Sequence, residues 1–357
     1  MSWLFDGHLD LAWNAIDWKR DLRQSVANIR QAERGRTEPG YGTNTVSLPA
    51  LREGRVGICI ATILARLHRP GNPMFGYATP EAVYAVGQGQ IAYYRALARA
   101  GDIRLLQWRE DLDEHLHQWN RSPATTPIGV ILSMEGADPV LDPSNIDEWY
   151  HAGLRAIGLT HYGLNRYGGG TAVKDGLAPM ASELLARIEK LGIALDMTHL
   201  SDQAFDEVRT LFQGRILASH QNVRRLVPDQ RQFTDEQLCL VIERGGVIGA
   251  AFDVWMLQAN YVRGESKPNV TLNTVADHIA YVCDLAGNAH HSGIGTDLDG
   301  GFGTEQTPTD IDTIADVIRL TDVLSSRGFA DKDIDLIMHG NWCRFWREIL
   351  PPRPART

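Results

Sequence analysis

Short apolar runs alternate with longer amphipathic stretches along the whole chain. The apolar runs are rich in β-branched residues and nearly continuous, which is typical of strands that are buried on both faces of a parallel sheet. We therefore predict strands at 3–10, 56–64, 128–134, 154–160, 193–198, 215–219, 246–252 and 292–297.

The stretches between these strands carry helix start signals. Thr79-Pro80-Glu81 combines an N-cap, a first-turn proline and an acid near the positive end of the helix dipole. Further helices are expected at 201–212, at 235–244 and at 310–326, the last closed by Gly328. Strands that are each followed by a helix favour an α/β fold of the (β/α)8 TIM-barrel type.

This barrel is expected to form one domain over residues 1–357, with an irregular tail at 350–357. A doubly wound sheet is the alternative, but it normally shows a glycine-rich phosphate loop. The glycines at 168–170 lack that spacing, and we predict that they form a flexible loop over the site.

Two insertions depart from a minimal barrel. Residues 11–50 follow the first strand and residues 65–78 follow the second. Both lie on the side where barrel enzymes carry their catalytic loops, so they are candidates for a lid or a specificity wall. Surface padding explains each insertion equally well.

Composition narrows the class of partner. The net charge of −9 and the lack of a basic run argue against nucleic-acid binding and favour a small-molecule or peptide substrate. The first residues do not have the pattern of a leader peptide. The apolar runs are all much shorter than the roughly 20 residues that span a bilayer, so we expect no membrane attachment. The four cysteines form no CxxC pair, which predicts separate buried thiols and a cytoplasmic protein. The oligomeric state stays open, with a homodimer as one option.

Candidate chemistry gathers where the predicted strands end. In a barrel these ends open onto one mouth, so residues far apart in sequence converge there. The residues in question are His8, Asp10, Glu135, His161, His199, His220, Asp297 and Asp299.

The His8-Leu9-Asp10 segment has the spacing of a ligand pair. Side chains at i and i+2 of a strand share a face, so His8 and Asp10 can offer nitrogen and oxygen to one zinc ion. If the pair is considered alone, a buried histidine that hydrogen-bonds an aspartate explains it better than a metal site does. Similar groups at the other strand ends favour the metal site.

Glu135 ends an apolar strand, where an unpaired carboxylate would cost several kcal/mol. A metal bridge explains the charge better than a structural glutamate does. A structural role in the core explains His199 or His220 when either is considered alone. Together with Glu135, they supply a second metal site. No lysine lies at a strand end to serve as the bridge instead. The sequence thus predicts two zinc ions that share a water, which they convert to hydroxide near neutral pH.

Asp297 follows the last strand and suits the general base and acid that passes a proton to the leaving nitrogen. Asp299 is its competitor on the same face, although a turn-forming role accounts for Asp299 well. The remaining histidines carry no predicted role, and His115 is expected to be solvated on an acidic helix.

Seven segments in this order resemble the membrane dipeptidase (renal dipeptidase) family of the metal-dependent amidohydrolase barrels. They are DGHLDL at 6–11, SMEG at 133–136, LRAIGLTHYGLN at 154–165, DMTHLSD at 196–202, SHQNVRRLVPDQRQFTDEQ at 219–237, GIGTDLDG at 293–300 and GNWCRFW at 340–346.

The resemblance implies a role for each matching residue. One zinc would be bound by His8 and Asp10 and the other by His199 and His220, with Glu135 bridging. His161 would touch the substrate or its oxyanion. Arg231 would hold the terminal carboxylate of the substrate, a task that suits the two parallel donors of a guanidinium.

The hypothesis from the sequence is a hydrolase of the metallo-dipeptidase type that contains two zinc ions. A metal-bridging hydroxide would cleave dipeptides, including those with a D-residue at the C-terminal position. Cleavage of N-acyl amino acids or lactones on the same barrel is the alternative within enzymes. A metal-free, non-catalytic binding barrel is the alternative outside them.

Overall fold

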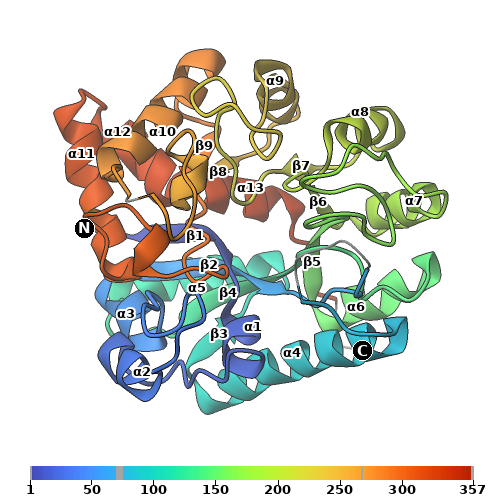
Figure 1. Ribbon diagram of the computed structural model, residues 1–357, viewed down its shortest axis with the longest axis horizontal. Helices are drawn as coiled ribbons and strands as arrows, with labels where there is room; N and C mark the ends of the chain where they lie inside the picture. Colours follow the sequence, from blue (N-terminus) through green and yellow to red (C-terminus); the bar gives the residue numbers. More distant parts are fainter. Residues whose placement is uncertain (1, 70–74, 267, 355–357) are drawn as a thin grey trace.

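The computed structural model describes residues 2–69, 75–266 and 268–354. A parallel sheet lies at the centre and helices surround it (Figure 1). The strands of the sheet follow the order β7-β6-β5-β4-β2-β1-β9-β8, and a parallel bridge between Ala218 and Ile248 links its two ends. The predicted (β/α)8 barrel is therefore confirmed. Its strands are β1 (Leu4–Leu9), β2 (Val56–Ile63), β4 (Ile128–Met134), β5 (Leu154–Gly158), β6 (Ala194–Asp196), β7 (Ile216–Leu217), β8 (Ile248–Ala250) and β9 (Ser292–Ile294).

All the predicted strands are present, several of them shorter than expected. One further strand, β3 (Ile103–Leu105), pairs with β4 outside the barrel path. The prediction missed β3 because the strand is only three residues long and two of them are partly exposed.

The helices occupy the intervals between the strands. Thr79, Ser201 and Thr234 cap helices as expected, each accepting a backbone N–H from the first turn. The helices are α1 (Leu11–Ile16), α2 (Val26–Ala32), α3 (Leu48–Glu53), α4 (Pro80–Ala100), α5 (Arg109–Arg121), α6 (Ile146–Ala152), α7 (Ala181–Leu191), α8 (Asp202–Leu211), α9 (Asp235–Glu243), α10 (Leu272–Ala286), α11 (Leu320–Ser326), α12 (Asp331–Asp335) and α13 (Asn341–Ile349), with 3-10 turns at Pro143–Asn145, Val254–Met256, Thr304–Gln306 and Ile314–Arg319 and a π-turn at Leu336–Gly340.

The helix expected from residue 310 starts later. Its first turns are the 3-10 segment Ile314–Arg319, capped by Thr313, and α11 follows. The Asp310 carboxylate instead accepts the backbone N–H of Leu272 at the start of α10. An aspartate that can cap either of two helices cannot be assigned from local sequence.

Side chains of the strands alternate between two apolar cores. Phe5, Ile58 and Ile60 point into the barrel, whereas Leu4 and Cys59 pack under the surrounding helices. All of these side chains are buried, which explains why the strands read as continuous apolar runs.

Helix α13 packs across the barrel end opposite to the site. The Trp342 indole donates a hydrogen bond to the carbonyl of Ile294 (2.9 Å). A Cβ placed on Gly7 or Gly293 would lie 2.7 Å from this indole, so only glycine admits it. The aromatic helix thereby fills the N-terminal end of the barrel and leaves the other end to polar groups.

The first insertion is folded against the barrel. It contains α1, α2 and α3, and its buried Arg20 bonds Glu33 (2.7 Å) and the carbonyl of Gly40 (2.6 Å). In the second insertion, residues 70–74 lie outside the described residues, and the backbones of Arg66 and Tyr77 are hydrogen-bonded (2.7 Å).

The run 168–170 is not the flexible loop that we expected. Its glycines are buried and form bridges with Leu164, Leu177 and Leu200, because a close backbone approach replaces side-chain packing there. A Cβ at Gly170 would lie 1.8 Å from the carbonyl oxygen of His161.

The cysteines are all free thiols, and Cys59, Cys283 and Cys343 are buried. Among the described residues, no helix combines the length and apolar character required to cross a bilayer. Residues 351–354 form no helix or strand, and residues 355–357 fall outside the described part of the tail.

Candidate metal centre and active site

The predicted site residues meet in one pocket at the carboxyl ends of the strands. Of the residues named from sequence, it is lined by Asp10, Glu135, His161, His199, Arg231 and Asp297. His8 and His220 lie directly behind, against Glu135.

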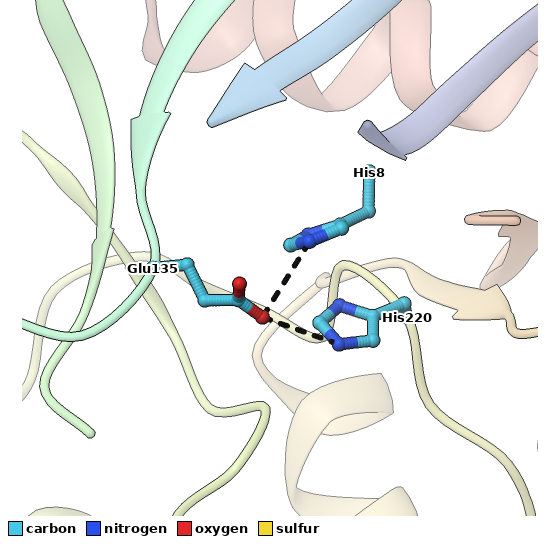
Figure 2. Close-up of side chains that lie close together, drawn as sticks. All are labelled: His8, Glu135 and His220. Carbon is cyan, nitrogen blue, oxygen red and sulfur yellow. Dashed lines mark ion pairs between the residues drawn. The ribbon is translucent and has the colours of Figure 1, made fainter. Parts of the chain in front are cut away.

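Glu135 stands at the centre of this cluster. Its Oε1 lies 3.5 Å from Nε2 of His8, 3.3 Å from Nε2 of His199 and 3.5 Å from Nε2 of His220. Figure 2 shows its carboxylate pointing between the rings of His8 and His220. The other oxygen, Oε2, faces Nε2 of His161 at 3.8 Å. A histidine from β1 and histidines that follow β6 and β7 thus converge on the glutamate that follows β4.

Hydroxyl groups orient the imidazoles from behind. Thr171 Oγ1 is 2.8 Å from Nδ1 of His199. Ser219 Oγ lies 3.1 Å from Nδ1 of His8 and 2.9 Å from Nδ1 of His220. With each Nδ1 engaged, the three Nε2 atoms are directed at the cluster, as a hydrogen bond to the other ring nitrogen orients metal-ligating histidines.

The protonation states suit metal ligands. Burial lowers the pKa of His8 to about 3 and the pKa values of His199 and His220 well below the usual value, so these rings are neutral. Burial, followed by the charge of Asp10, raises the pKa of Glu135 well above its ordinary value. Burial also raises the pKa of Asp10 to about 6. Neutral imidazoles next to uncompensated carboxylates are the environment that a cation stabilises.

The donor spacing also fits a metal. Zinc–ligand bonds of about 2.1 Å in a tetrahedron place donors about 3.4 Å apart. The three separations among Glu135 Oε1, His199 Nε2 and His220 Nε2 are 3.1, 3.3 and 3.5 Å. On the other side, Nε2 of His8 lies 3.8 Å from an oxygen of Asp10 and has no hydrogen-bond partner among the described residues. Three overlapping groups of candidate ligands result: His8–Glu135–His220, Glu135–His161–His199 and His8–Asp10–Asp297.

The two aspartates after β9 differ in environment. Asp297 lines the pocket, with Oδ1 at 3.8 Å from Nε2 of His8. Burial, followed by the charges of Asp10 and Glu135, raises its pKa well above the ordinary value. The backbone φ is positive at both residues, +58° at Asp297 and +64° at Asp299, so it does not distinguish them. Asp299 instead accepts the backbone N–H groups of Thr45 (2.7 Å) and Val46 (2.9 Å).

His161 is held by an arginine that the sequence analysis did not select. Nη1 of Arg66 lies 3.2 Å from Nδ1 of His161, and both side chains are buried. A guanidinium only donates hydrogen bonds, so Nδ1 accepts and the proton of neutral His161 sits on Nε2. Burial lowers the pKa of His161 well below its usual value, which keeps the ring neutral. The Nε2–H group is therefore a fixed donor facing the pocket.

Arg231 is 3% exposed and lines the same pocket. Its Nη1 donates to Oε1 of Gln221 (2.7 Å) and its Nη2 donates to the carbonyl of His220 (2.9 Å). These bonds fix the plane of the guanidinium without neutralising its charge.

Arg66 and Asp253 line the pocket and were missed by sequence reasoning. Asp253 directly follows the predicted strand 246–252, so the rule that selected the other strand ends could have found it. Arg66 lies in the predicted insertion 65–78, but a single arginine in a loop carries no signal of its own.

Known proteins resemble this chain over its length. The model of the membrane dipeptidase family, peptidase family M19, matches residues 1–351. An uncharacterized protein in the pqqA 5′ region of Klebsiella pneumoniae is 27% identical over 259 residues, which cover 70% of this chain and 90% of that protein. Dipeptidase aclJ from Aspergillus oryzae is 27% identical over 352 residues, which cover 97% of this chain and 78% of that protein.

Solved structures show the same fold. A dipeptidase described as a metallopeptidase of family M19 has a TM-score of 0.77 at 23% identity, over 98% of this chain and 99% of the other. A metallopeptidase from Rhodobacter sphaeroides, liganded with a phosphinate mimic of L-Ala-D-Ala, has a TM-score of 0.76 at 21% identity over the same shares. Because the family model covers nearly the whole sequence, this chain belongs to the membrane dipeptidase family, peptidase family M19, and is an enzyme of the metallo-dipeptidase type.

Proposed function

We propose that this enzyme is a dipeptidase with two zinc ions that hydrolyses the peptide bond of dipeptides, including those with a D-residue at the C-terminal position. The observation that carries the proposal is the position of Glu135, whose Oε1 lies within 3.5 Å of three neutral imidazoles. Dipeptide cleavage follows from membership of the family. The tolerance for a D-residue rests on the family resemblance alone.

The ligand assignment follows the two sides of Glu135. His8 and Asp10 would hold one ion, His199 and His220 the other, and Glu135 would contact both. When bound, two zinc ions supply a hydroxide at neutral pH and polarise the scissile carbonyl. Thr62, whose hydroxyl bonds the carboxylate of Asp10, would orient that ligand.

Asp297 is the proposed proton carrier. It would accept the proton of the attacking water and deliver it to the leaving nitrogen. Burial, followed by the charges of Asp10 and Glu135, raises its pKa above the ordinary value, which supports a carboxyl that accepts a proton and returns it.

His161 and Arg231 would hold the substrate. The Nε2–H group of His161 would donate a hydrogen bond to the carbonyl oxygen as negative charge develops there. Arg66 would keep that proton in place by donating to Nδ1. Arg231 would bind the terminal carboxylate, for which its fixed guanidinium plane is suited.

We also propose a cytoplasmic location. Free thiols, three of them buried, are usual in a reducing compartment.

A metal titration with a substrate panel tests the function. Protein stripped with a chelator should show no hydrolysis, and activity on dipeptides should rise to a plateau at about two zinc ions per chain. Dipeptides should be cleaved much faster than N-acyl amino acids or lactones. A plateau near one ion would overturn the binuclear assignment, and preferred cleavage of a lactone would overturn the dipeptidase. Well under one ion bound, with no activity, would indicate a non-catalytic binding barrel.

A further inference from the structure

One charged group in the pocket has no part in the proposed chemistry. Asp253 follows β8, is 6% exposed and lines the pocket together with Trp255 and Met256. Its Oδ1 accepts hydrogen bonds from the Gln306 amide (2.8 Å) and from the backbone N–H of Trp255 (3.2 Å). The indole of Trp255 also lowers the pKa of Asp253 through a hydrogen bond. These donors hold the carboxylate in place, but all of them are neutral.

No ion pair within 4.0 Å includes Asp253 among the described residues. Burial raises the pKa of Asp253 to about 7, and the more distant charge of Arg231 opposes this rise. A buried carboxylate that lines a substrate pocket, pairs with no cation and binds no metal is a candidate for binding a cationic group of the substrate.

Hydrogen bonds show at which end of the pocket Asp253 lies. The backbone N–H of Phe252 donates to the carbonyl of Thr296 (3.0 Å), and the Gln232 amide donates to the carbonyl of Met256 (2.7 Å). The segment that carries Asp253 therefore lies beside the residues next to Asp297 and Arg231.

In the proposed function this is the end that receives the leaving residue. Arg231 would bind its carboxylate and Asp297 would protonate its nitrogen. Once a substrate carboxylate occupies Arg231, that cation no longer offsets Asp253, and two negative charges lie at one end of a dry pocket. A positive group on the leaving residue would relieve this repulsion.

We propose that Asp253 selects dipeptides whose C-terminal residue has a cationic side chain, such as lysine or ornithine. The aliphatic stem would pack against Trp255 and Met256, and the ammonium group would bind the Asp253 carboxylate. This inference rests on the proposed function, because the role of Arg231 defines the end of the pocket at which the leaving residue binds.

The test compares substrates that differ only in charge. The zinc-loaded enzyme is assayed with Ala-Lys, with Ala-(Nε-acetyl-Lys) and with Ala-Leu, using both L- and D-forms of the C-terminal residue. Because a hydrogen bond to a charged group is worth about a decade or more in rate, kcat/KM for Ala-Lys should exceed that for the acetylated substrate by about 10-fold or more.

The variant Asp253→Asn should remove this preference. It should lower kcat/KM for Ala-Lys by about 10-fold more than for the two neutral substrates, so that Ala-Lys and its acetylated form are cleaved with similar efficiency. Asp253→Glu keeps the charge and should keep the preference for lysine. Asp284→Asn removes an exposed carboxylate on α10, outside the pocket, and is the matched control.

Each other outcome overturns the inference. If the wild type cleaves Ala-Lys and its acetylated form with equal kcat/KM, the inference is wrong, and this result does not depend on whether Asp253→Asn folds. An equal loss on all three substrates would mean that Asp253 binds a group common to every dipeptide, such as the amino terminus, or supports the fold. If the wild type cleaves none of the dipeptides, the proposed function itself fails, which is a different result from cleavage without a charge preference.

Discussion

The contact between Arg66 and His161 leads to a prediction about catalysis. Arg66→Met keeps the length of the side chain and removes both the charge and the hydrogen bond to Nδ1, which is 3.2 Å long in the wild type. Without that donor, the proton of His161 can move to Nδ1. The Nε2 atom would then present a lone pair, instead of a donor, to the developing negative charge.

The expected size of the effect follows from that one bond. A hydrogen bond from a charged donor contributes about 1.5–3 kcal/mol, and about 1.4 kcal/mol corresponds to a tenfold change in rate. If the bond serves only to fix the proton, kcat should fall by about 10- to 150-fold. KM should change less, because Arg231 rather than Arg66 is proposed to bind the carboxylate. Arg66→Lys retains a cationic donor and should recover part of kcat.

Two measurements separate this role from general support of the fold. Steady-state kinetics of the zinc-loaded wild type, Arg66→Met and Arg66→Lys give the division between kcat and KM. Nitrogen NMR of ¹⁵N-histidine-labelled, metal-free protein reports which nitrogen of His161 carries the proton. The reasoning is wrong if Arg66→Met retains full kcat, or if the proton stays on Nε2 after the substitution.

Further predictions concern the base, the pH dependence of stability and one close backbone contact. Asp297→Asn should bind zinc normally but lose more than about 100-fold in kcat, measured beside its metal content; full activity would refute its assignment. Burial lowers the pKa of His278 to about 4, below the 6.5 of an exposed histidine. The unfolded chain therefore binds more protons at this position, and His278 should contribute a loss of up to about 1.4 kcal/mol of stability per pH unit as pH falls from about 6.5 to 4. His278→Gln should show a weaker dependence in chemical denaturation, and an unchanged slope would contradict the assignment. Gly295→Ala places a Cβ 1.8 Å from the carbonyl oxygen of Ser219 and should cost more than about 3 kcal/mol in the same assay. Gly89→Ala, with open space around its Cβ, should be neutral or stabilising.

The barrel could be predicted from sequence because both faces of its strands are buried. Continuous apolar runs such as 128–134 are visible without knowledge of their partners. The helix starts were equally local, since the cap at Thr79 depends on only three neighbouring residues. The sites where prediction failed depend on distant segments. His115 was expected to face solvent on an acidic helix, but it is fully buried and its Nε2 lies 2.9 Å from the carbonyl of Gly57 on β2.

The convergence of the candidate site residues could be predicted because a barrel brings every strand end to one mouth. The same rule gives no distances, and it could not separate Asp297 from Asp299 by position. It also could not show that Arg66 reaches His161, since these residues are 95 positions apart and the contact depends on the path of a loop.

Backbone hydrogen bonds distinguish three aspartates at the barrel mouth from Glu135 and Asp297. Asp6 accepts the backbone N–H groups of His8 (3.1 Å) and Thr296 (2.9 Å). Asp196 and Asp299 likewise accept two backbone N–H groups each, and Asp299 also lies 3.5 Å from the guanidinium of Arg20. These contacts stabilise the buried carboxylates and tie neighbouring segments together.

Glu135 and Asp297 have the opposite environment. Among the described residues, neither carboxylate accepts a hydrogen bond from a backbone N–H group, although burial raises the pKa of both. A buried carboxylate without donors would cost several kcal/mol if nothing compensated its charge. The chain supplies backbone donors to the neighbouring aspartates but not to these two, and this difference supports the proposal that metal ions held by the surrounding imidazoles compensate their charge.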